Sequence, residues 1–248
     1  MSHFHCDLAD SPLPRLGVLV LENDETLEED LRRIFPPEVA RLHVSRVPSR
    51  AELNPETLQA MEATIPAAAD LLPKAPRYAA VGYGCTSGAM MIGADRVREL
   101  VSEAAPTDSV TEPFTATLKA LEVTGVRRLG LISPYIETVA APLQQALEAQ
   151  GIVVPHSLSF GEEQEPKVAR ISPQSLMDAA GAIVREGDID GIFLSCTNLR
   201  TLDIIPTLED TLGLPVLSSN QTLAWHMATL SGVVGQAVGP GRLWRLRP

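Results

Sequence analysis

Residues 16–37 read LGVLVLENDETLEEDLRRIFPP. The first six are an unbroken apolar run, which is typical of a parallel β-strand buried on both faces. Leu27, Leu31 and Ile34 then recur at helical spacing, and two prolines end the helix. A buried strand followed directly by an amphipathic helix is the repeating unit of an α/β fold.

The same alternation of strand and helix continues to the C-terminal region. We predict further strands at residues 41–47, 78–83, 128–132, 152–156, 191–194 and 215–217. The helices predicted between them cover residues 55–72, 88–101, 113–123, 136–150, 175–186, 201–212 and 221–230. Strands separated by helices of this length imply parallel sheets, and ligands of such sheets bind beyond the carboxyl ends of the strands.

A second α/β unit begins in the stretch Thr117–Tyr135, which reads as helix, turn and strand. We therefore predict an α/β fold of two pseudo-symmetric lobes, each a short parallel sheet flanked by helices, with the active site in the cleft between them. The predicted N-terminal lobe comprises residues 1–110 together with 216–248. Residues 111–215 form the predicted second lobe.

Composition excludes several classes of function. The chain has 248 residues, 45% of them hydrophobic, and a net charge of −11, which argues against a nucleic-acid or anionic-membrane partner. No run of 18 apolar residues and no secretory signal are found, so we expect a soluble, cytoplasmic protein. The sequence has no HExxH, paired CxxC, GxGxxG or Walker motif, and we expect neither a metal nor another cofactor. Three cysteines are too few for a disulfide framework.

Two cysteines occur in matching contexts, Cys85 in VGYGCTSG and Cys196 in IFLSCTNL. Each follows a short apolar run and precedes a small polar residue. A free cysteine is among the most buried residue types, so either thiol alone is explained by core packing. The duplicated context favours function instead, because a thiol at a helix N-terminus is stabilised as the thiolate. Two such thiols facing each other could remove a proton from one face of a carbon and return one to the other.

Polar side chains next to both cysteines are candidates for substrate binding. The hydroxyl groups of Thr86, Ser87 and Thr197 and the amide of Asn198 could cradle a carboxylate or an enediolate oxygen. Farther along, the strand predicted at residues 215–217 is followed by Ser218, Ser219 and Asn220, which could line the same cleft. Cys6 stands beside two histidines in the polar N-terminal segment. We favour an unstructured terminus there over a weak metal site.

Three motifs resemble the aspartate/glutamate racemase superfamily, in its branch of maleate cis-trans isomerases, arylmalonate decarboxylases and ectoine-utilisation proteins. They are YGCTSG at 83–88, SCTNLRTLDIIPTLE at 195–209 and PVLSSNQTLAWH at 215–226. The resemblance implies two pseudo-symmetric lobes, no cofactor, and Cys85 and Cys196 as the catalytic pair. Arylmalonate decarboxylases typically keep only the second cysteine, so Cys85 favours an isomerase or racemase. Tyr135 resembles a superfamily tyrosine that reaches the substrate, the alternative being a tyrosine on the rim.

The loop after the first strand departs from the maleate isomerase pattern. Those enzymes grip a substrate carboxylate with an Asn-Thr-Thr type loop, whereas Asp24 aligns with that asparagine here. A carboxylate at this position repels a second carboxylate and attracts an ammonium group. The alternative is that Asp24 only caps the helix that starts near Thr26. This loop, the segment SFGEEQEPKVARI at 159–171 and the ending SSNQTLAWHMATLSG at 218–232 look most like the ectoine-utilisation proteins.

Our leading hypothesis from the sequence is an isomerase or racemase that acts at the α-carbon of a small amino or acylamino carboxylic acid in ectoine breakdown. A first alternative is a maleate cis-trans isomerase, in which a thiolate adds to the double bond. A second alternative is a non-enzymatic sensor that binds a metabolite or uses the thiols as a redox switch. The sequence leaves open the exact substrate, its stereochemistry, which thiol acts first, and assembly into a homo-oligomer.

Overall fold

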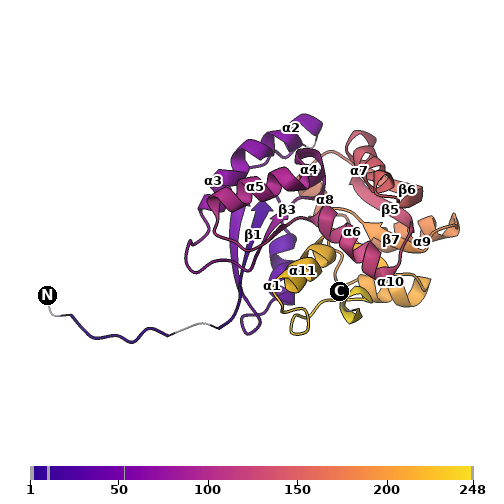
Figure 1. The fold of residues 1–248 in the computed structure, drawn as a ribbon. Coiled ribbons are helices and arrows are strands. Elements are labelled where there is room, and N and C mark those ends of the chain that lie inside the picture. The colour runs from indigo at the N-terminus through magenta and orange to yellow at the C-terminus, as the bar shows by residue number, and fades with distance from the viewer. Residues whose placement is uncertain (1–2, 10–11, 53, 247–248) are drawn as a thin grey trace.

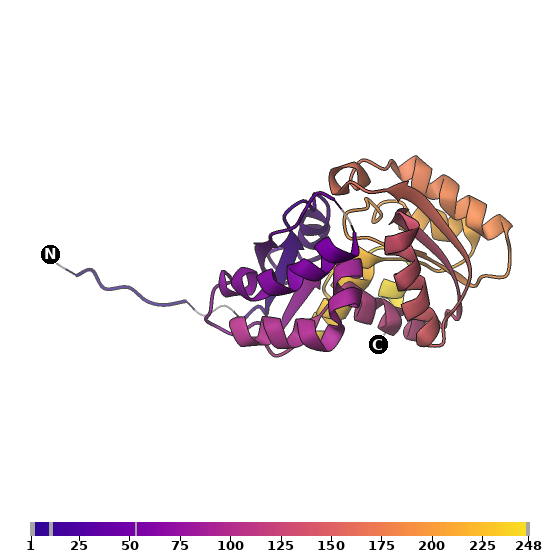
Figure 2. The same cartoon turned by 90° about the horizontal axis from the view of Figure 1, so that it is seen from above.

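The computed structural model describes residues 3–9, 12–52 and 54–246. Two four-stranded sheets lie side by side, one in each lobe (Figures 1 and 2), in the orders β2-β1-β3-β4 and β6-β5-β7-β8. The strands are β1 (Arg15–Leu21), β2 (Arg41–Val47), β3 (Ala80–Gly84), β4 (Val110–Thr111), β5 (Arg128–Tyr135), β6 (Val153–Glu162), β7 (Gly191–Leu194) and β8 (Val216–Ser218). Every pairing is parallel, and both sheets use the same order of second, first, third and fourth strand. The predicted fold class is confirmed.

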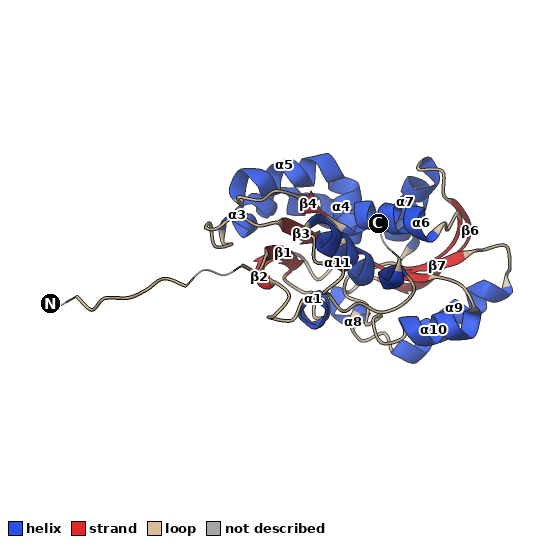
Figure 3. Cartoon of the chain, turned by 60° about the horizontal axis from the view of Figure 1, so that its bottom comes forward, coloured by secondary structure: helices blue, strands red, loops and turns tan. Residues whose placement is uncertain are grey.

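Helices flank both sheets (Figure 3). They are α1 (Leu27–Ile34), α2 (Pro55–Ala60), α3 (Ile65–Asp70), α4 (Thr86–Ile92), α5 (Ala94–Ala104), α6 (Pro113–Thr124), α7 (Glu137–Ala149), α8 (Glu165–Val168), α9 (Pro173–Arg185), α10 (Ile205–Leu212) and α11 (Ser219–Leu230), with 3₁₀ turns at Met61–Thr64 and Leu243–Arg245. Two predicted helices are divided in the structure. The first is interrupted by a 3₁₀ turn just before Pro66, and the second breaks at Gly93, whose φ is +94°.

The central strands position the loops in which the candidate site residues lie. All seven residues of β1 are buried, as are all five of β3 and all four of β7, which explains their continuous apolar sequences. Their carboxyl ends lead directly to the ENDET loop, to Cys85 and to Ser195-Cys196. Tyr135 is the last residue of β5. The sheets therefore deliver all of these side chains at strand ends, where α/β folds bind ligands.

The predicted boundary at residue 216 is wrong for the strand that follows it. Residues 216–218 were assigned to the N-terminal lobe, but β8 pairs with β7 and completes the second sheet, with Ile192 beside Val216. All three residues of β8 are buried, and pairing with β7 satisfies their backbone groups. Helix α11 then packs against α1 and β3 of the first lobe and against α6 and β8. No helix within the described residues is long and apolar enough to cross a membrane.

Candidate active site

Cys85 lies at the junction between β3 and α4 and is the N-cap residue of that helix. Its backbone is extended, with φ −151° and ψ 116°, and its Sγ accepts a hydrogen bond from the N–H of Gly88 at 3.2 Å. The side chain is 6% exposed. A Cβ added at Gly88 would lie 2.9 Å from the sulfur, so the absence of a side chain there makes room for the thiol.

Cys196 adopts a backbone conformation that L-residues rarely occupy, with φ +144°. Three contacts hold it. Its N–H donates to Ser219 Oγ at 3.0 Å, its Sγ accepts from the N–H of Asn198 at 3.2 Å, and Tyr135 Oη lies 2.7 Å from the sulfur. Backbone strain of this kind persists only where the surroundings impose it, and it occurs most often at functional sites.

The two cysteine loops are hydrogen-bonded to each other. Thr197, next to Cys196, donates from Oγ1 to the carbonyl of Gly84 at 3.3 Å, and Gly84 directly precedes Cys85. In the other direction, Thr86 Oγ1 donates at 2.8 Å to Ser219 Oγ, the oxygen that also accepts from the N–H of Cys196. The structure therefore brings Cys85 and Cys196 into a single site between the two lobes.

Asp24 caps α1 and also leaves one oxygen unused. Oδ1 accepts from the N–H groups of Thr26 and Leu27, both at 2.8 Å, which is the capping role considered above. Oδ2 is buried and has no hydrogen-bond partner within the described residues. Burial raises the pKa of Asp24, and the two backbone N–H groups, the side chain of Thr197 and the charge of Arg46 oppose that rise.

Glu165 is a second buried carboxyl group at the site, and the sequence analysis did not single it out. It is 2% exposed, and its Oε2 accepts a hydrogen bond from Tyr135 Oη at 3.2 Å. Burial, and then the charge of Asp24, raise the pKa of Glu165 to about 7. Its sequence context, GEEQEP, is a run of acidic residues in which one buried member has no distinguishing signal.

The expectation of lowered thiol pKa values at a helix N-terminus is wrong for thiols that are buried as deeply as these. Burial raises the pKa of Cys85 to about 12, and it raises the pKa of Cys196 well above its ordinary value. The backbone N–H groups of Gly88 and Asn198 oppose these shifts but do not outweigh desolvation. The charges of the same two carboxyl groups, Glu165 and Asp24, raise both thiol pKa values further.

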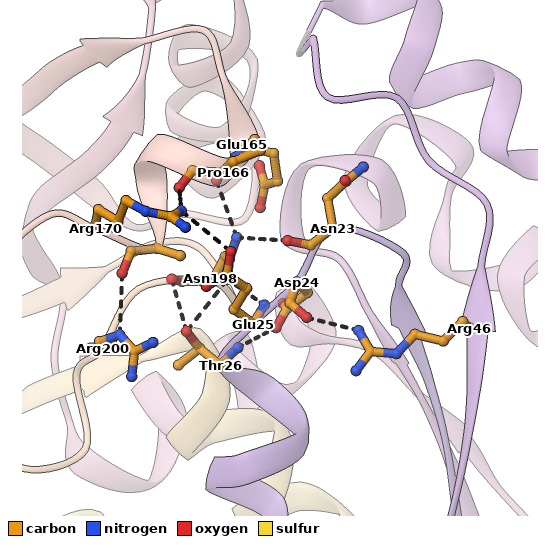
Figure 4. Close-up of polar contacts among 11 residues, drawn as sticks. Asn23, Asp24, Glu25, Thr26, Arg46, Glu165, Pro166, Arg170, Asn198 and Arg200 are labelled. Atoms are coloured by element: carbon orange, nitrogen blue, oxygen red, sulfur yellow. Dashed lines mark hydrogen bonds and ion pairs between the residues drawn. The ribbon is translucent and has the colours of Figure 1, made fainter.

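Asn198 uses its side chain to connect neighbouring loops (Figure 4). Oδ1 accepts from the N–H of Glu25 at 2.8 Å, and Nδ2 donates to the carbonyls of Asn23 and Glu165, each at 3.3 Å. The side chain is fully buried. Its contacts hold the Cys196 loop in position, and its contact with substrate stays a prediction.

The other predicted residues also lie inside the protein. Thr86, Ser87 and Thr197 are buried at the two cysteine loops. Tyr135 is 7% exposed and bonded to Cys196, so it is not a tyrosine on the rim. Cys6 is exposed in the N-terminal segment, which extends away from both lobes (Figure 1). Among the described residues, no group of three His, Cys, Asp or Glu side chains is placed to hold a metal ion.

The site is closed by a contact between the lobes. The N–H of Glu165 donates to the carbonyl of Ala51 at 2.9 Å, and Glu52 forms an antiparallel bridge with Gln164. The thiols and the carboxyl groups behind this contact are all buried.

Comparison with known proteins identifies one matching family and two kinds of related enzyme. A profile of the family "Arylmalonate decarboxylase" matches residues 49–244. The arylmalonate decarboxylase of Bordetella bronchiseptica is 38% identical over 136 residues, which cover 54% of this chain and 57% of that protein. The maleate isomerase of Alcaligenes faecalis is 25% identical over 244 residues, which cover 92% of this chain and 95% of that enzyme.

Among solved structures, a liganded double mutant of arylmalonate decarboxylase superimposes with a TM-score of 0.81 and 28% identity. The superposition covers 93% of this chain and 98% of that one. The predicted resemblance to the branch of maleate isomerases and arylmalonate decarboxylases is confirmed.

Proposed function

The chain belongs to the arylmalonate decarboxylase family and is an enzyme, and we propose that it is a cofactor-independent isomerase or racemase acting at the α-carbon of a small amino or acylamino carboxylic acid. The observation that carries this proposal is the pair of buried thiols, Cys85 and Cys196, on loops that are hydrogen-bonded to each other. Together they supply both the group that accepts the α-proton and the group that returns a proton.

Proton transfer between the thiols accounts for the pairing. One cysteine, as the thiolate, takes the α-proton, and the other, as the thiol, gives its proton to the opposite face of the carbon. The product is the mirror-image acid, and the thiol and thiolate have exchanged roles, so atoms and charge balance. The intermediate carries negative charge on the substrate carboxylate. The first turn of α4 offers N–H groups without intrahelical partners to that charge, beside the hydroxyl groups of Thr86 and Ser87.

The acidic groups support a substrate that bears an amine. Asp24 Oδ2 has no hydrogen-bond partner within the described residues, and the charges of Asp24 and Glu165 act on both thiols. A dicarboxylate would add two negative groups to the two carboxyl groups of this enclosed space, whereas the ammonium group of an amino acid would neutralise one already present. We place the reaction in ectoine breakdown, on the resemblance of residues 22–26 and 159–171 to ectoine-utilisation proteins.

Maleate isomerisation is the second candidate function. It is favoured by the match to a maleate isomerase over 92% of this chain. In that reaction one thiolate adds to the double bond, the single bond rotates, and elimination releases fumarate. Asp24→Asn discriminates between the two candidates. Under our proposal this change raises turnover of maleate, whereas a loss of maleate turnover would favour the second candidate.

Proton NMR in D₂O tests the proposed function directly. The panel contains maleate, aspartate, glutamate, diaminobutyrate and the two N-acetyl derivatives of diaminobutyrate. The variants are Cys85→Ser and Cys196→Ser, with Cys6→Ser as a matched control at an exposed cysteine. We expect deuterium at the α-carbon of one amino or acylamino acid, abolished in both site variants and retained in the control. Conversion of maleate to fumarate alone would establish the second candidate. No exchange, together with a reversible Cys85–Cys196 disulfide, would favour a redox sensor.

A further inference from the structure

The hydroxyl group of Tyr83 is a fully buried polar group without a hydrogen-bond partner in the described part of the chain. Tyr83 lies in β3, paired with Leu19 of β1, and is two residues before Cys85. A buried hydroxyl group that is left unpaired destabilises the folded state, because its hydrogen bond to water is lost on folding and not replaced. The position of Tyr83 therefore requires an explanation.

The unpaired hydroxyl group lies beside the sulfur of Cys85. A Cβ added at Gly88 would stand 3.1 Å from Tyr83 Oη, 2.9 Å from Cys85 Sγ and 2.8 Å from the terminal methyl of Met61. The hydroxyl oxygen of Tyr83 and the sulfur of Cys85 thus both border the small space beside the Cα of Gly88, and the methyl group of Met61 borders it as well. The N–H of Gly88 already donates to the sulfur at 3.2 Å. A side chain at Gly88 would fill the space in which the hydroxyl group approaches the thiol.

The second thiol has the corresponding arrangement with its hydrogen bonds formed. Cys196 Sγ accepts from one backbone N–H, that of Asn198, and lies 2.7 Å from a tyrosine hydroxyl, that of Tyr135. Cys85 has the backbone N–H bond and a tyrosine hydroxyl nearby that is not yet bonded. The two halves of the site therefore hold the same set of groups around each sulfur.

We propose that Tyr83 is a further catalytic residue, whose hydroxyl group donates a hydrogen bond to the sulfur of Cys85 when that thiol ionises. This inference rests on the role of Cys85 in the proposed function. When Cys85 ionises, its proton passes to solvent, and the side chain of Tyr83, whose hydroxyl group makes no hydrogen bond among the described residues, moves toward the negative sulfur. A hydrogen bond to a charged group is stronger than one to a neutral group, so the ionised state gains most from it.

Charges around the two groups keep Tyr83 in the form that can donate. Burial, followed by the charges of Cys85 and of Glu112, raises the pKa of Tyr83 well above its ordinary value. Glu112 is the buried N-cap of α6, where its carboxylate accepts from the N–H groups of Phe114 and Thr115. Glu165 and Asp24 act on Cys85 itself and oppose its ionisation. Tyr83 would counter these two carboxylates.

The test measures thiol ionisation without any substrate, so its outcome is independent of whether the proposed reaction is correct. Iodoacetamide alkylation of each cysteine is followed by peptide mass spectrometry from pH 6 to pH 10, with exposed Cys6 as the reference in the same sample. We expect Tyr83→Phe to slow alkylation of Cys85 by roughly tenfold or more at a fixed pH and to shift its pH profile upward, with Cys196 unaffected. Tyr135→Phe should do the reverse.

A matched control and a stability measurement separate this role from a structural one. Tyr78→Phe removes a different buried hydroxyl group, which accepts from Arg15 Nη2 at 3.4 Å, and it should leave both pH profiles unchanged. The melting temperature of Tyr83→Phe should equal or exceed that of the parent, because the lost hydroxyl group has no partner to leave behind. If Tyr83→Phe lowers the melting temperature and leaves the pH profile of Cys85 in place, Tyr83 is structural and the proposal is overturned.

Discussion

Replacing Glu165 with glutamine should stabilise the protein at alkaline pH and change it little at acid pH. Burial raises the pKa of Glu165 from 4.5 to about 7 in the folded protein, and in the unfolded chain that rise is lost. Between these values the unfolded state binds fewer protons than the folded state, so stability falls as pH rises through this window. The raised pKa of Glu165 lowers the free energy of unfolding by about 3 kcal/mol at pH 8 and by roughly 1 kcal/mol at pH 5.

Urea denaturation at pH 5 and pH 8 measures this difference. Glutamine has the size of glutamate and carries no charge, so Glu165→Gln should gain about 2 kcal/mol more at pH 8 than at pH 5. Glu163→Gln is the matched control, because Glu163 is exposed two residues away and should show no such gain. Asp30, whose pKa burial also raises to about 7, should leave some pH dependence in every variant. An equal gain at both pH values, or none at pH 8, would refute the reasoning.

Substitutions at three further positions of the site, with one control glycine elsewhere, test its geometry by the same assay. Gly88→Ala should cost about 1–3 kcal/mol and disturb the adjacent thiol, because its Cβ would lie 2.8 Å from the nearest side chain. Gly181→Ala, in α9, should instead stabilise by about 0.5–1 kcal/mol, because its Cβ would lie 3.6 Å from Arg185 Nη1, and similar effects at both glycines would contradict this reading. Cys196→Gly should be about 1 kcal/mol more stable than Cys196→Ala, since only glycine tolerates φ +144° without strain, and equal stability would show that the loop is unstrained. Asn198→Ala should cost about 2–3 kcal/mol by leaving the N–H of Glu25 unpaired, and a loss below about 1 kcal/mol would show that water replaces the amide.

The architecture could be predicted from sequence because it depends on local patterns. The continuous apolar runs at β1 and β7 indicate strands buried on both faces, and both are buried throughout. By contrast, β4 has two residues and α8 has four, too few to show a periodicity. The place of β8 in the second sheet also could not be read, since its sequence fits a buried strand of either lobe.

The site was predictable where a motif marks it, and unpredictable where burial defines it. The repeated Cys-Thr pairs identify Cys85 and Cys196 from sequence alone. Glu165 is buried among contacts between residues far apart in the chain, such as the hydrogen bond from its N–H to the carbonyl of Ala51 in the other lobe. The direction of the thiol pKa shifts was missed for the same reason. A helix N-terminus is visible in the sequence, whereas the loss of water around the sulfur atoms is not.

The carboxyl groups connect substrate choice to thiol ionisation. The charges of Glu165 and Asp24 raise the pKa of both cysteines in the closed site, so a ligand that neutralises those charges lowers both thiol pKa values. An ammonium group on the substrate proposed here would do this, while a second carboxylate would have the opposite effect. Under the proposed function the correct substrate therefore promotes ionisation of the thiol that removes its α-proton. Above pH 7 the ionised carboxylate of Glu165 destabilises the folded protein. Under the proposed function, this loss of stability is the cost of a negative charge that binds the substrate.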